Sequence, residues 1–339
     1  MTPAPPPAVS VLLPVRNGMP YLPAAIDSVR QQSFRDFELL VIDDGSTDGT
    51  ASYLRTVTDA RVRVVTTPLP GLASALNAGL AEARGRYVAR QDADDWSATH
   101  RLARQVAWLD ARPDIAVLAS AASFIDERDA PVESAWTRAV RAQWDTAVTP
   151  DQIAELMPLT CCIFHATVMA HTATLRDAGG YDQATVPAED YDLWLRLLPA
   201  HRFARLAEPL YAVRIHAASS SAIGRASQLD RVIEAKLRYV RRQVPELPWP
   251  VRLVLPGHDR GAQVFRRVGR PLGYEAAPTS GGDESDIDVV AITDFAALPA
   301  FSAVAAASGC CTRFGNLFVR GALVRATGAS GARGGRAAS

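Results

Sequence analysis

The chain is poor in several residue types, and each shortage narrows what the protein can be. Its 339 residues include 4 cysteines, which form two adjacent pairs, Cys161 with Cys162 and Cys310 with Cys311. Neither pair has CxxC spacing and no zinc pattern joins them, so we expect reduced, partly buried thiols. Lys236 is the only lysine, and arginine supplies nearly all of the positive charge.

An excess of one charge and a long apolar run are also absent. Lysine and arginine number 36 and aspartate and glutamate 36, so nothing draws the chain generally toward nucleic acid or anionic lipid. No apolar run approaches the roughly 20 residues that span a bilayer, and the start MTPAPPPAV lacks the charge and apolar core of a signal peptide. We expect a cytoplasmic protein with no transmembrane segment and no nucleic-acid partner, while peripheral contact with the inner face of a membrane stays open.

What the chain does contain is a regular alternation of strand and helix patterns. Short apolar runs end at turn residues, and segments with apolar residues three and four positions apart follow them. The expected strands are 9–13, which stops at Pro14, then 37–42, 61–66, 87–89 and 115–120, and the expected helices begin near Leu22, Thr50, Gly71 and Arg101. This alternation predicts an α/β fold with a Rossmann-like, mostly parallel sheet flanked by helices, whose ligands bind at the carboxyl ends of the strands.

Two acidic clusters follow predicted strands at that edge of the sheet. The segment GRYVARQDADDW runs from a strand into Asp92, Asp94 and Asp95, and Asp43 and Asp44 follow an earlier strand. Carboxylates at a strand end suit Mg²⁺ or Mn²⁺, which leave coordination positions for the phosphates of a substrate. An isolated acidic turn is more often simply solvated, so the neighbouring sequence has to distinguish a metal site from a solvated turn.

Four segments, in this order, carry a recognisable resemblance: VSVLLPVRNG, SVRQQSFRDFELLVIDDGSTDGT, GLASALNAGLAEARGRYVARQDADD and AEDYDLWLRL. Over residues 8–220 the chain resembles a family 2 glycosyltransferase of the GT-A fold. The resemblance implies that a sugar moves from a nucleoside-diphosphate donor, usually UDP-linked, to an acceptor hydroxyl with inversion at the anomeric carbon. It also implies a role in polysaccharide or glycan biosynthesis, with a saccharide or a lipid-linked saccharide as acceptor.

Matched position by position, the resemblance implies a donor site at the strand ends. Asp44 matches a carboxylate that accepts the imide N–H of uracil, a bond that an ionised carboxylate suits. Arg16 stands where the family more often has tyrosine, which leaves the base contact open. Asn77 reads equally well as a residue that packs its helix on the sheet. The expected nucleotide-sugar-binding residues are Pro14, Arg16, Asp43, Asp44, Asn77, Asp92, Ala93 and Asp94.

The resemblance further implies that Mn²⁺ or Mg²⁺ binds the diphosphate of the donor. Asp94 matches the carboxylate that binds the metal directly, and Asp92 matches one that reaches the ribose or a metal-bound water. His216, in LYAVRIHAASSSA, matches a histidine that reaches the metal or the diphosphate from a loop. The cation would act as a Lewis acid on the departing nucleotide.

The acceptor chemistry is implied for the later segment AEDYDLWLRL. Asp190 matches the general base, and Glu189 matches a neighbour that orients the acceptor or tunes Asp190. Both acids also suit the first turn of a helix, and the two interpretations are compatible. His165 and Trp194 are the expected acceptor-region residues, although His165 reads equally well as a buried core histidine.

The remaining length predicts further parts of the chain. The expected order is a disordered proline-rich start at 1–8, a GT-A domain at 9–224, an amphipathic helix with a proline-rich linker at 225–250, a small accessory α/β region at 251–325 and a disordered tail at 326–339. Two other functions stay open from the sequence. One is a catalytically silent module that binds nucleotide sugars, and the other is a sugar nucleotidyltransferase, whose glycine-rich G-x-G-T-R-L start is missing here.

Overall fold

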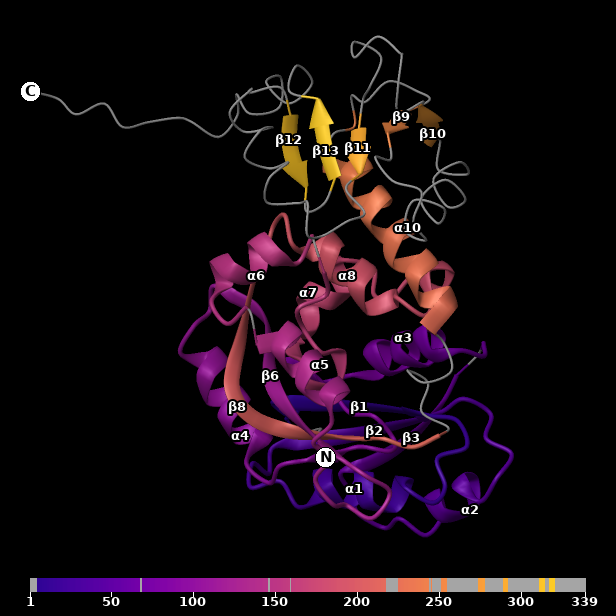
Figure 1. Cartoon of the computed structure of the whole chain (residues 1–339). Coiled ribbons are helices and arrows are strands. Elements are labelled where there is room, and N and C mark those ends of the chain that lie inside the picture. The colour runs from indigo at the N-terminus through magenta and orange to yellow at the C-terminus, as the bar shows by residue number, and fades with distance from the viewer. Residues whose placement is uncertain are drawn as a thin grey trace, which may run out of the picture. The chain divides into compact units, whose positions relative to one another are not determined.

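The computed structural model of the chain describes residues 5–67, 69–145, 147–158, 160–217, 225–243 and 245, together with five short strands between 251 and 320. The chain divides into two compact units (Figure 1). The first comprises residues 1–157 and 161–225, and the second comprises residues 158–160 and 226–339.

The first unit is built on an eight-stranded sheet in the order β3-β2-β1-β4-β7-β6-β8-β5. Its strands are β1 (Val9–Val15), β2 (Phe37–Asp43), β3 (Val62–Thr66), β4 (Tyr87–Arg90), β5 (Trp96–Ser97), β6 (Ile115–Ile125), β7 (Met169–His171) and β8 (Arg202–Arg214). β1 pairs in parallel with β2 and β4, β2 pairs in parallel with β3, and β6 with β8, whereas β7 and β5 pair antiparallel with their neighbours. The prediction of a mostly parallel sheet is confirmed.

Helices flank this sheet, as the alternating pattern predicts (Figure 1). They are α1 (Leu22–Arg30), α2 (Thr50–Leu54), α3 (Leu72–Glu82), α4 (Arg101–Asp110), α5 (Ala135–Asp145), α6 (Pro150–Leu156), α7 (Thr172–Asp177) and α8 (Glu189–Leu197), with single 3₁₀ turns at His165–Thr167 and Gln183–Thr185.

The first strand differs from its prediction, because it continues through Pro14 to Val15. β4 pairs with β1 only as far as Leu12, so the missing amide hydrogen of Pro14 removes no ladder bond to β4. The strand therefore reaches the edge where the acidic clusters lie.

The two faces of β1 pack against different helices. Val11 and Leu13 lie in a core cluster with Ile26 of α1 and Val106 of α4. On the other face α3 approaches so closely that a Cβ on Gly79 would lie 2.8 Å from the Cδ1 atom of Ile42. Leu12 and Leu13 are both fully buried, and truncating either to alanine should cost roughly 2–5 kcal/mol of stability.

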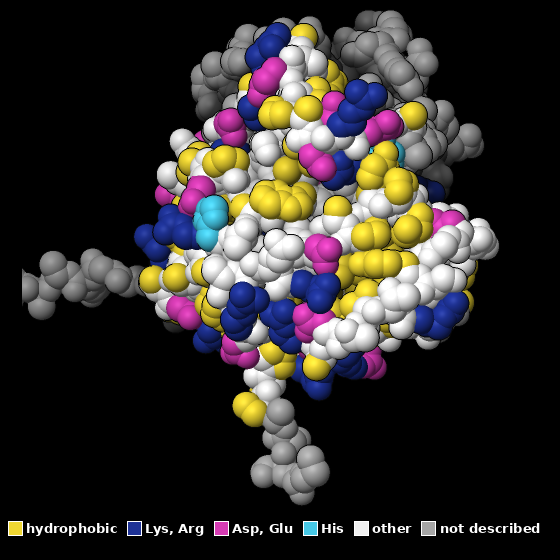
Figure 2. Space-filling view, turned by 90° about the horizontal axis from the view of Figure 1, so that it is seen from below, with side chains coloured by type: hydrophobic (Ala, Val, Ile, Leu, Met, Phe, Trp, Pro, Cys, Tyr) yellow, Lys and Arg dark blue, Asp and Glu magenta, His cyan; other side chains and the backbone are white. Residues whose placement is uncertain are grey.

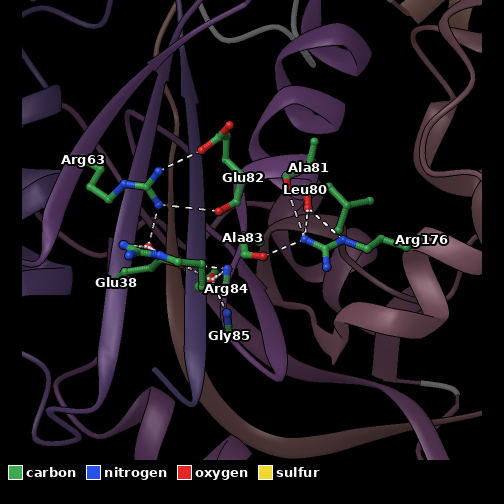
Figure 3. Close-up of polar contacts among 10 residues, drawn as sticks. Glu38, Arg63, Leu80, Ala81, Glu82, Ala83, Arg84, Gly85 and Arg176 are labelled. Carbon is green, nitrogen blue, oxygen red and sulfur yellow. Dashed lines mark hydrogen bonds and ion pairs between the residues drawn. The ribbon is translucent and has the colours of Figure 1, made fainter. Parts of the chain in front are cut away.

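An ion-pair network on Glu38 holds the sheet near its opposite edge (Figure 3). The Glu38 carboxylate, 4% exposed, accepts hydrogen bonds from Ser10 Oγ at 2.7 Å, Arg63 Nη1 at 2.9 Å and Arg84 Nη2 at 2.7 Å. Burial alone would raise the pKa of Glu38, but the hydrogen bonds from Arg84, Ser10 and Arg63 outweigh it and lower that pKa. The network fastens β2 to β1, to β3 and to the turn after α3.

Arg176 of α7 closes the C-terminal end of α3 (Figure 3). Its Nη2 atom donates to the backbone carbonyls of Leu80 at 2.8 Å and Ala83 at 2.6 Å. The last carbonyls of a helix have no partner inside the helix, and a cation there also suits the helix dipole. Arg176 therefore fixes the end of the helix whose start faces the acidic edge.

The second unit contains α10 (Arg225–Gln243) apart from its first residue, and a five-stranded sheet in the order β10-β9-β11-β13-β12. The strands are β9 (Val251–Val254), β10 (Tyr274–Ala277), β11 (Val289–Ala291), β12 (Cys311–Phe314) and β13 (Leu317–Arg320). β9 pairs in parallel with β10 and β11, and β13 pairs antiparallel with β11 and β12. Most of the predicted start, linker, accessory region and tail lies outside the described residues, so those domain assignments stay predictions.

The surface carries charge of both signs. On the face shown in Figure 2, basic and acidic side chains are interspersed over the described part, and apolar side chains gather on its right-hand side. This mixture agrees with the balanced composition of the chain. Among the helices of the described residues, none has both the length and the apolar character that crossing a bilayer requires.

Candidate active site

A cleft of about 710 Å³ lies at the carboxyl ends of β1, β2 and β4. This volume is within the range of roughly 300–1,000 Å³ found for small-molecule sites. Seven of the predicted site residues line it, namely Pro14, Arg16, Asp44, Asp92, Ala93, Asp94 and His216. The cleft therefore brings together residues from three strand ends and from the segment after β8.

Asp44 presents an unpaired acceptor in this cleft. Its Oδ2 atom accepts the backbone N–H of Gly71 at 2.9 Å, whereas its buried Oδ1 atom has no hydrogen-bond partner among the described residues. Gly71 has φ +114°, and a Cβ there would lie 2.6 Å from Gln183 Nε2, so the position requires glycine. An unpaired buried oxygen is unfavourable by about 1–3 kcal/mol unless a ligand donor pairs with it.

Asp43 lies beside Asp44 but makes a local contact. Its Oδ1 atom accepts the backbone N–H of Ser46 at 3.0 Å and so shapes the turn after β2. It is not among the residues that line the cleft. The predicted contact of Asp43 with a nucleotide sugar stays a prediction.

Hydrogen bonds join the loop after β1 to the loop after β2. Asn17, at φ 57°, turns the first loop toward the second. The bonds run from Asn17 N to Ser46 Oγ at 2.9 Å, Gly18 N to Thr50 Oγ1 at 2.9 Å, Met19 N to Asp48 Oδ2 at 3.1 Å, and Thr47 N to Asn17 Oδ1 at 2.8 Å. Both loops are thus positioned before any ligand binds, which reduces the entropy lost on binding.

Asp94 and His216 meet at another wall of the cleft. The distance from His216 Nε2 to Asp94 Oδ2 is 2.9 Å, and the Tyr21 ring packs 4.8 Å from the His216 ring. Burial raises the pKa of Asp94, the charge of Asp92 raises it further, and His216 opposes the rise. The wall thus contains two carboxylates that repel each other.

Arg214 holds the backbone around these carboxylates. Its Nε donates to the Asp94 carbonyl at 2.8 Å, Nη1 to the Asp126 carbonyl at 2.8 Å and Nη2 to Asp129 Oδ1 at 2.6 Å. Its backbone N–H donates to Asp95 Oδ1 at 2.7 Å. Burial and the charges of the neighbouring aspartates raise the pKa of Asp95 well above its usual value. Asp95 and Arg214 therefore hold in place the backbone that carries Asp94.

Arg90 connects the strand β4 to Asp92. Its guanidinium is buried, Nη2 donates to Asp92 Oδ1 at 2.6 Å, Nη1 donates to the Gln91 carbonyl, and Nε has no partner among the described residues. The Asp92 backbone N–H in turn donates to the hydroxyl of Tyr211 at 2.9 Å. Asp92 is therefore oriented through both its side chain and its backbone.

Glu189 and Asp190 occupy the first turn of α8. Burial, and then the charge of Asp190, raise the pKa of Glu189 to about 7. Burial raises the pKa of Asp190 to about 6, although the Tyr191 backbone N–H, which donates to Asp190 Oδ1 at 2.7 Å, and the charge of Arg90 oppose the rise. A carboxylate whose pKa lies near the working pH suits general-base catalysis.

These two acids are not among the residues that line the cleft, whereas Val186 and Pro187, just before them in the chain, are. The Oε2 atom of Glu189 is buried without a partner among the described residues. The pair therefore follows two lining residues in the chain without lining the cleft itself.

The other three predicted residues pack against protein. Asn77 Nδ2 donates to the Tyr181 carbonyl at 2.8 Å and Asn77 Oδ1 accepts the Tyr181 N–H at 2.8 Å. His165 Nε2 lies 3.0 Å from the Tyr181 hydroxyl, and burial lowers the pKa of His165 well below its usual value. Trp194 is fully buried and packs edge-on against His165. These contacts favour packing roles, and ligand contact by these three residues stays a prediction.

Known proteins are similar in sequence to this chain. A family model described as Glycosyl transferase family 2 matches residues 10–170. The chain is 33% identical over 215 residues to "Putative glycosyltransferase EpsE" of Bacillus subtilis (strain 168), an alignment that covers 61% of this chain and 73% of that protein. The chain belongs to glycosyltransferase family 2.

A further relative and a solved structure are also similar to the chain. The Escherichia coli protein named UDP-Glc:alpha-D-GlcNAc-diphosphoundecaprenol beta-1,3-glucosyltransferase WfaP is 27% identical over 221 residues, covering 63% of this chain and 80% of that protein. The crystal structure of S. aureus TarS 1-349 in complex with UDP-GlcNAc superposes with a TM-score of 0.55 at 19% identity, covering 78% of this chain and 71% of that one. That likeness shows the GT-A fold predicted from the sequence.

The glycosyltransferase cleft fits a divalent cation held jointly with a substrate. Within the described residues no group of three or more His, Cys, Asp and Glu side chains is arranged as a complete metal site. Mg²⁺ and related cations commonly take only one or two carboxylates and complete their coordination with phosphates and water. Asp92 and Asp94 supply two such carboxylates, and a cation would relieve the repulsion that raises the pKa of Asp94.

Two residues that shape this cleft were not predicted from the sequence. Arg90 carried a signal, because a charge at the end of a buried apolar strand needs a partner when it is buried with that strand. Gly71, at the start of α3, had no such signal, since its role depends on Asp44 and Gln183. One residue could have been inferred locally and the other only from the fold.

Proposed function

We propose that this glycosyltransferase moves a sugar from a UDP-linked donor to an acceptor hydroxyl with inversion at the anomeric carbon. The observation that carries the proposal is the unpaired, buried Oδ1 atom of Asp44 in the cleft. A carboxylate oxygen can only accept, and the imide N–H of uracil is a matching donor. The names of WfaP and of the TarS complex, which specify UDP-Glc and UDP-GlcNAc, support the same donor class.

The diphosphate of the donor would lie at the end of β4. Asp94, with Asp92 and His216 beside it, would hold Mn²⁺ or Mg²⁺ there. When bound, such a cation stabilises negative charge that develops on the leaving nucleotide. Arg90 keeps the Asp92 carboxylate in place, and Arg214 fixes the backbone of Asp94.

The acceptor would be activated by Asp190. The oxygen of the acceptor hydroxyl attacks the anomeric carbon, the bond from that carbon to the UDP oxygen breaks, and the hydroxyl proton passes to the Asp190 carboxylate. A positioned base typically contributes about 10²- to 10⁴-fold to the rate. Glu189, whose raised pKa keeps it partly protonated at neutral pH, would orient the acceptor or tune Asp190.

The acceptor proposed here is a saccharide, free or linked to a lipid diphosphate, in polysaccharide or glycan biosynthesis. The name of WfaP, which includes a diphosphoundecaprenol-linked sugar, supports this class for the family. A cytoplasmic site of action, in solution or at the inner face of the membrane, is the corresponding proposal for location.

Release of UDP from UDP-glucose and UDP-N-acetylglucosamine, with and without Mn²⁺, tests this function. We expect slow, metal-dependent release by the wild type, loss of release in Asp94→Ala and in Asp190→Asn, and no change in Asp177→Ala, which alters an exposed carboxylate of α7. Binding of UDP without turnover of any donor would instead favour a module that only binds nucleotide sugars.

A further inference from the structure

Arg16 stands over Asp44 with its donors available. Its Nη1 atom lies 4.0 Å from Asp44 Oδ2, and the Arg16 side chain is 62% exposed. Among the described residues the guanidinium makes no other ion pair and no hydrogen bond, and Arg16 lines the cleft. The hydrogen bonds between the two loops hold the backbone next to Arg16. The start of the Arg16 side chain is therefore fixed, while its guanidinium remains available to bind a ligand.

The strand order gives Arg16 a defined side of the nucleotide. β1 lies between β2 and β4, so Arg16, after β1, stands between Asp44, after β2, and Asp92, after β4. A donor with its base at Asp44 and its diphosphate at Asp92 therefore has Arg16 on the ribose side of the base. In a pyrimidine nucleotide the group on that side of N3 is the C2 carbonyl, because C2 joins N3 to the nitrogen that carries the ribose.

We propose that Arg16 and Asp44 select the nucleobase as a pair. Arg16 donates to the C2 carbonyl while Asp44 Oδ1 accepts from N3–H, an inference that rests on the proposed function and specifies its donor class. The Oδ2 atom of Asp44 is already engaged by Gly71 at 2.9 Å, which leaves one oxygen for one ring N–H. The geometry thus fits the edge of uracil.

The same pair disfavours two other bases, each through a different residue. Guanine carries an amino group where uracil carries its C2 carbonyl, so the guanidinium of Arg16 would face another donor. Cytosine has an unprotonated N3, so the carboxylate of Asp44 would face another acceptor. Such mismatches let a site reject competing ligands in addition to attracting its own.

Calorimetric titration with UDP, CDP and GDP in the presence of Mg²⁺ tests the role of Arg16. In Arg16→Met we expect UDP affinity to fall about tenfold and GDP affinity to change little, so the preference for UDP over GDP shrinks. Arg55→Met removes the same charge from an exposed residue outside the cleft and should leave all three affinities unchanged. A thermal unfolding midpoint close to that of the wild type shows that each variant is folded.

Asp44→Asn tests the other half of the pair. The carbonyl oxygen of the variant amide can keep the hydrogen bond from Gly71, which places its NH₂ group where Oδ1 now lies. That group donates to the N3 atom of cytosine, so we expect the preference to change from UDP to CDP.

The outcomes separate this inference from the function on which it rests. If Arg16→Met lowers the affinities for UDP, CDP and GDP by the same factor, Arg16 contacts phosphates and the inference is wrong. The inference is also wrong if Arg16→Met changes none of these affinities, or if the wild type binds GDP more tightly than UDP. In each of these cases the proposed glycosyl transfer still stands. If the wild type binds no nucleoside diphosphate with either Mg²⁺ or Mn²⁺, the proposed function itself fails.

Discussion

His216 Nε2 lies 2.9 Å from Asp94 Oδ2, although the two residues are 122 positions apart in the chain. The contact joins the segment that follows β8 to the end of β4 at the cleft. The His216 side chain, which can bind a cation, is therefore already in contact with Asp94, the carboxylate that is expected to bind that cation.

This contact predicts an effect of His216 on metal-dependent binding. In His216→Ala we expect the Mn²⁺ concentration needed for half-maximal UDP binding to rise about tenfold, because second ligands and orienting partners are commonly worth 10- to 100-fold in metal affinity. A titration of UDP binding against Mn²⁺ measures it. His100→Ala, an exposed histidine paired with Glu208, is the control, and equal behaviour of the two variants would contradict a role at the metal.

Asp190 predicts a pH dependence of activity. Because its pKa is raised to about 6, the fraction of ionised base falls as the pH drops through 6, and the rate of UDP release should fall with it. The rate profile of the wild type between pH 5 and 8 measures this. A profile that stays flat through pH 6 would argue that another group accepts the proton.

The same carboxyl predicts a gain in stability when it is replaced. A raised pKa means that the folded state binds more protons than the unfolded state between about pH 4 and 6, so the free energy of unfolding falls as the pH rises through that window. In Asp190→Asn we therefore expect the protein to be more stable by roughly 1 kcal/mol at pH 8, with no gain near pH 4. Urea unfolding at both pH values provides the measurement, and a loss of stability at pH 8 would contradict the argument.

Gly71 predicts a coupled loss of stability and nucleotide binding. Gly71→Ala places a Cβ at φ +114° and 2.6 Å from Gln183 Nε2, which should cost roughly 1–3 kcal/mol and displace the N–H that orients Asp44. Gly179→Ala is a matched control, since Gly179 has φ +79° with no atom within 4 Å of its added Cβ. We expect both variants to be less stable in urea and only the first to bind UDP weakly.

Glu38 predicts sensitivity to acid. Its lowered pKa means that its ion pairs stabilise the fold above the ordinary pKa of 4.5 and lose that effect as the pH falls further. Glu38→Gln should therefore lower stability at pH 7 by about 1–3 kcal/mol, with a smaller loss near pH 3 and unchanged UDP affinity. Glu82→Gln, at a carboxylate that is 53% exposed and pairs with Arg63, should have little effect. Equal effects of the two variants would show that burial of Glu38 is unimportant.

Local patterns predicted the strands β1, β2, β3, β4 and β6 and the acidic clusters at one edge of the sheet, whereas the strands β5, β7 and β8 were not predicted. Hydrophobic periodicity is a property of neighbouring residues, so β2 and α1 appear where the sequence places them. Pro14 was expected to end β1, but the strand continues through it. The pairing with β4 stops at Leu12, so no hydrogen bond to β4 requires an amide hydrogen at Pro14.

Contacts between distant residues could not be predicted in this way. The pairing of Asn77 with Tyr181 spans 104 positions, and nothing near Asn77 indicates that its amide is used by the backbone of another segment. Arg90 is different, because it lies only two residues before Asp92 and its charge at the end of an apolar strand already indicated the need for a partner. The residue types indicated the chemistry of the site, whereas the hydrogen-bond partners of these residues depended on the fold.

Arg214 has a consequence for how members of this family can diverge. Because one side chain binds the carbonyls of Asp94 and Asp126 and the carboxylate of Asp129, an insertion or deletion in the turn at 126–129 would also shift the backbone of the carboxylate motif. Natural variation that changes acceptor choice should therefore spare the length of this turn and accumulate further along, beyond residue 130. An alignment of close relatives would show this as a conserved spacing between β6 and Pro131.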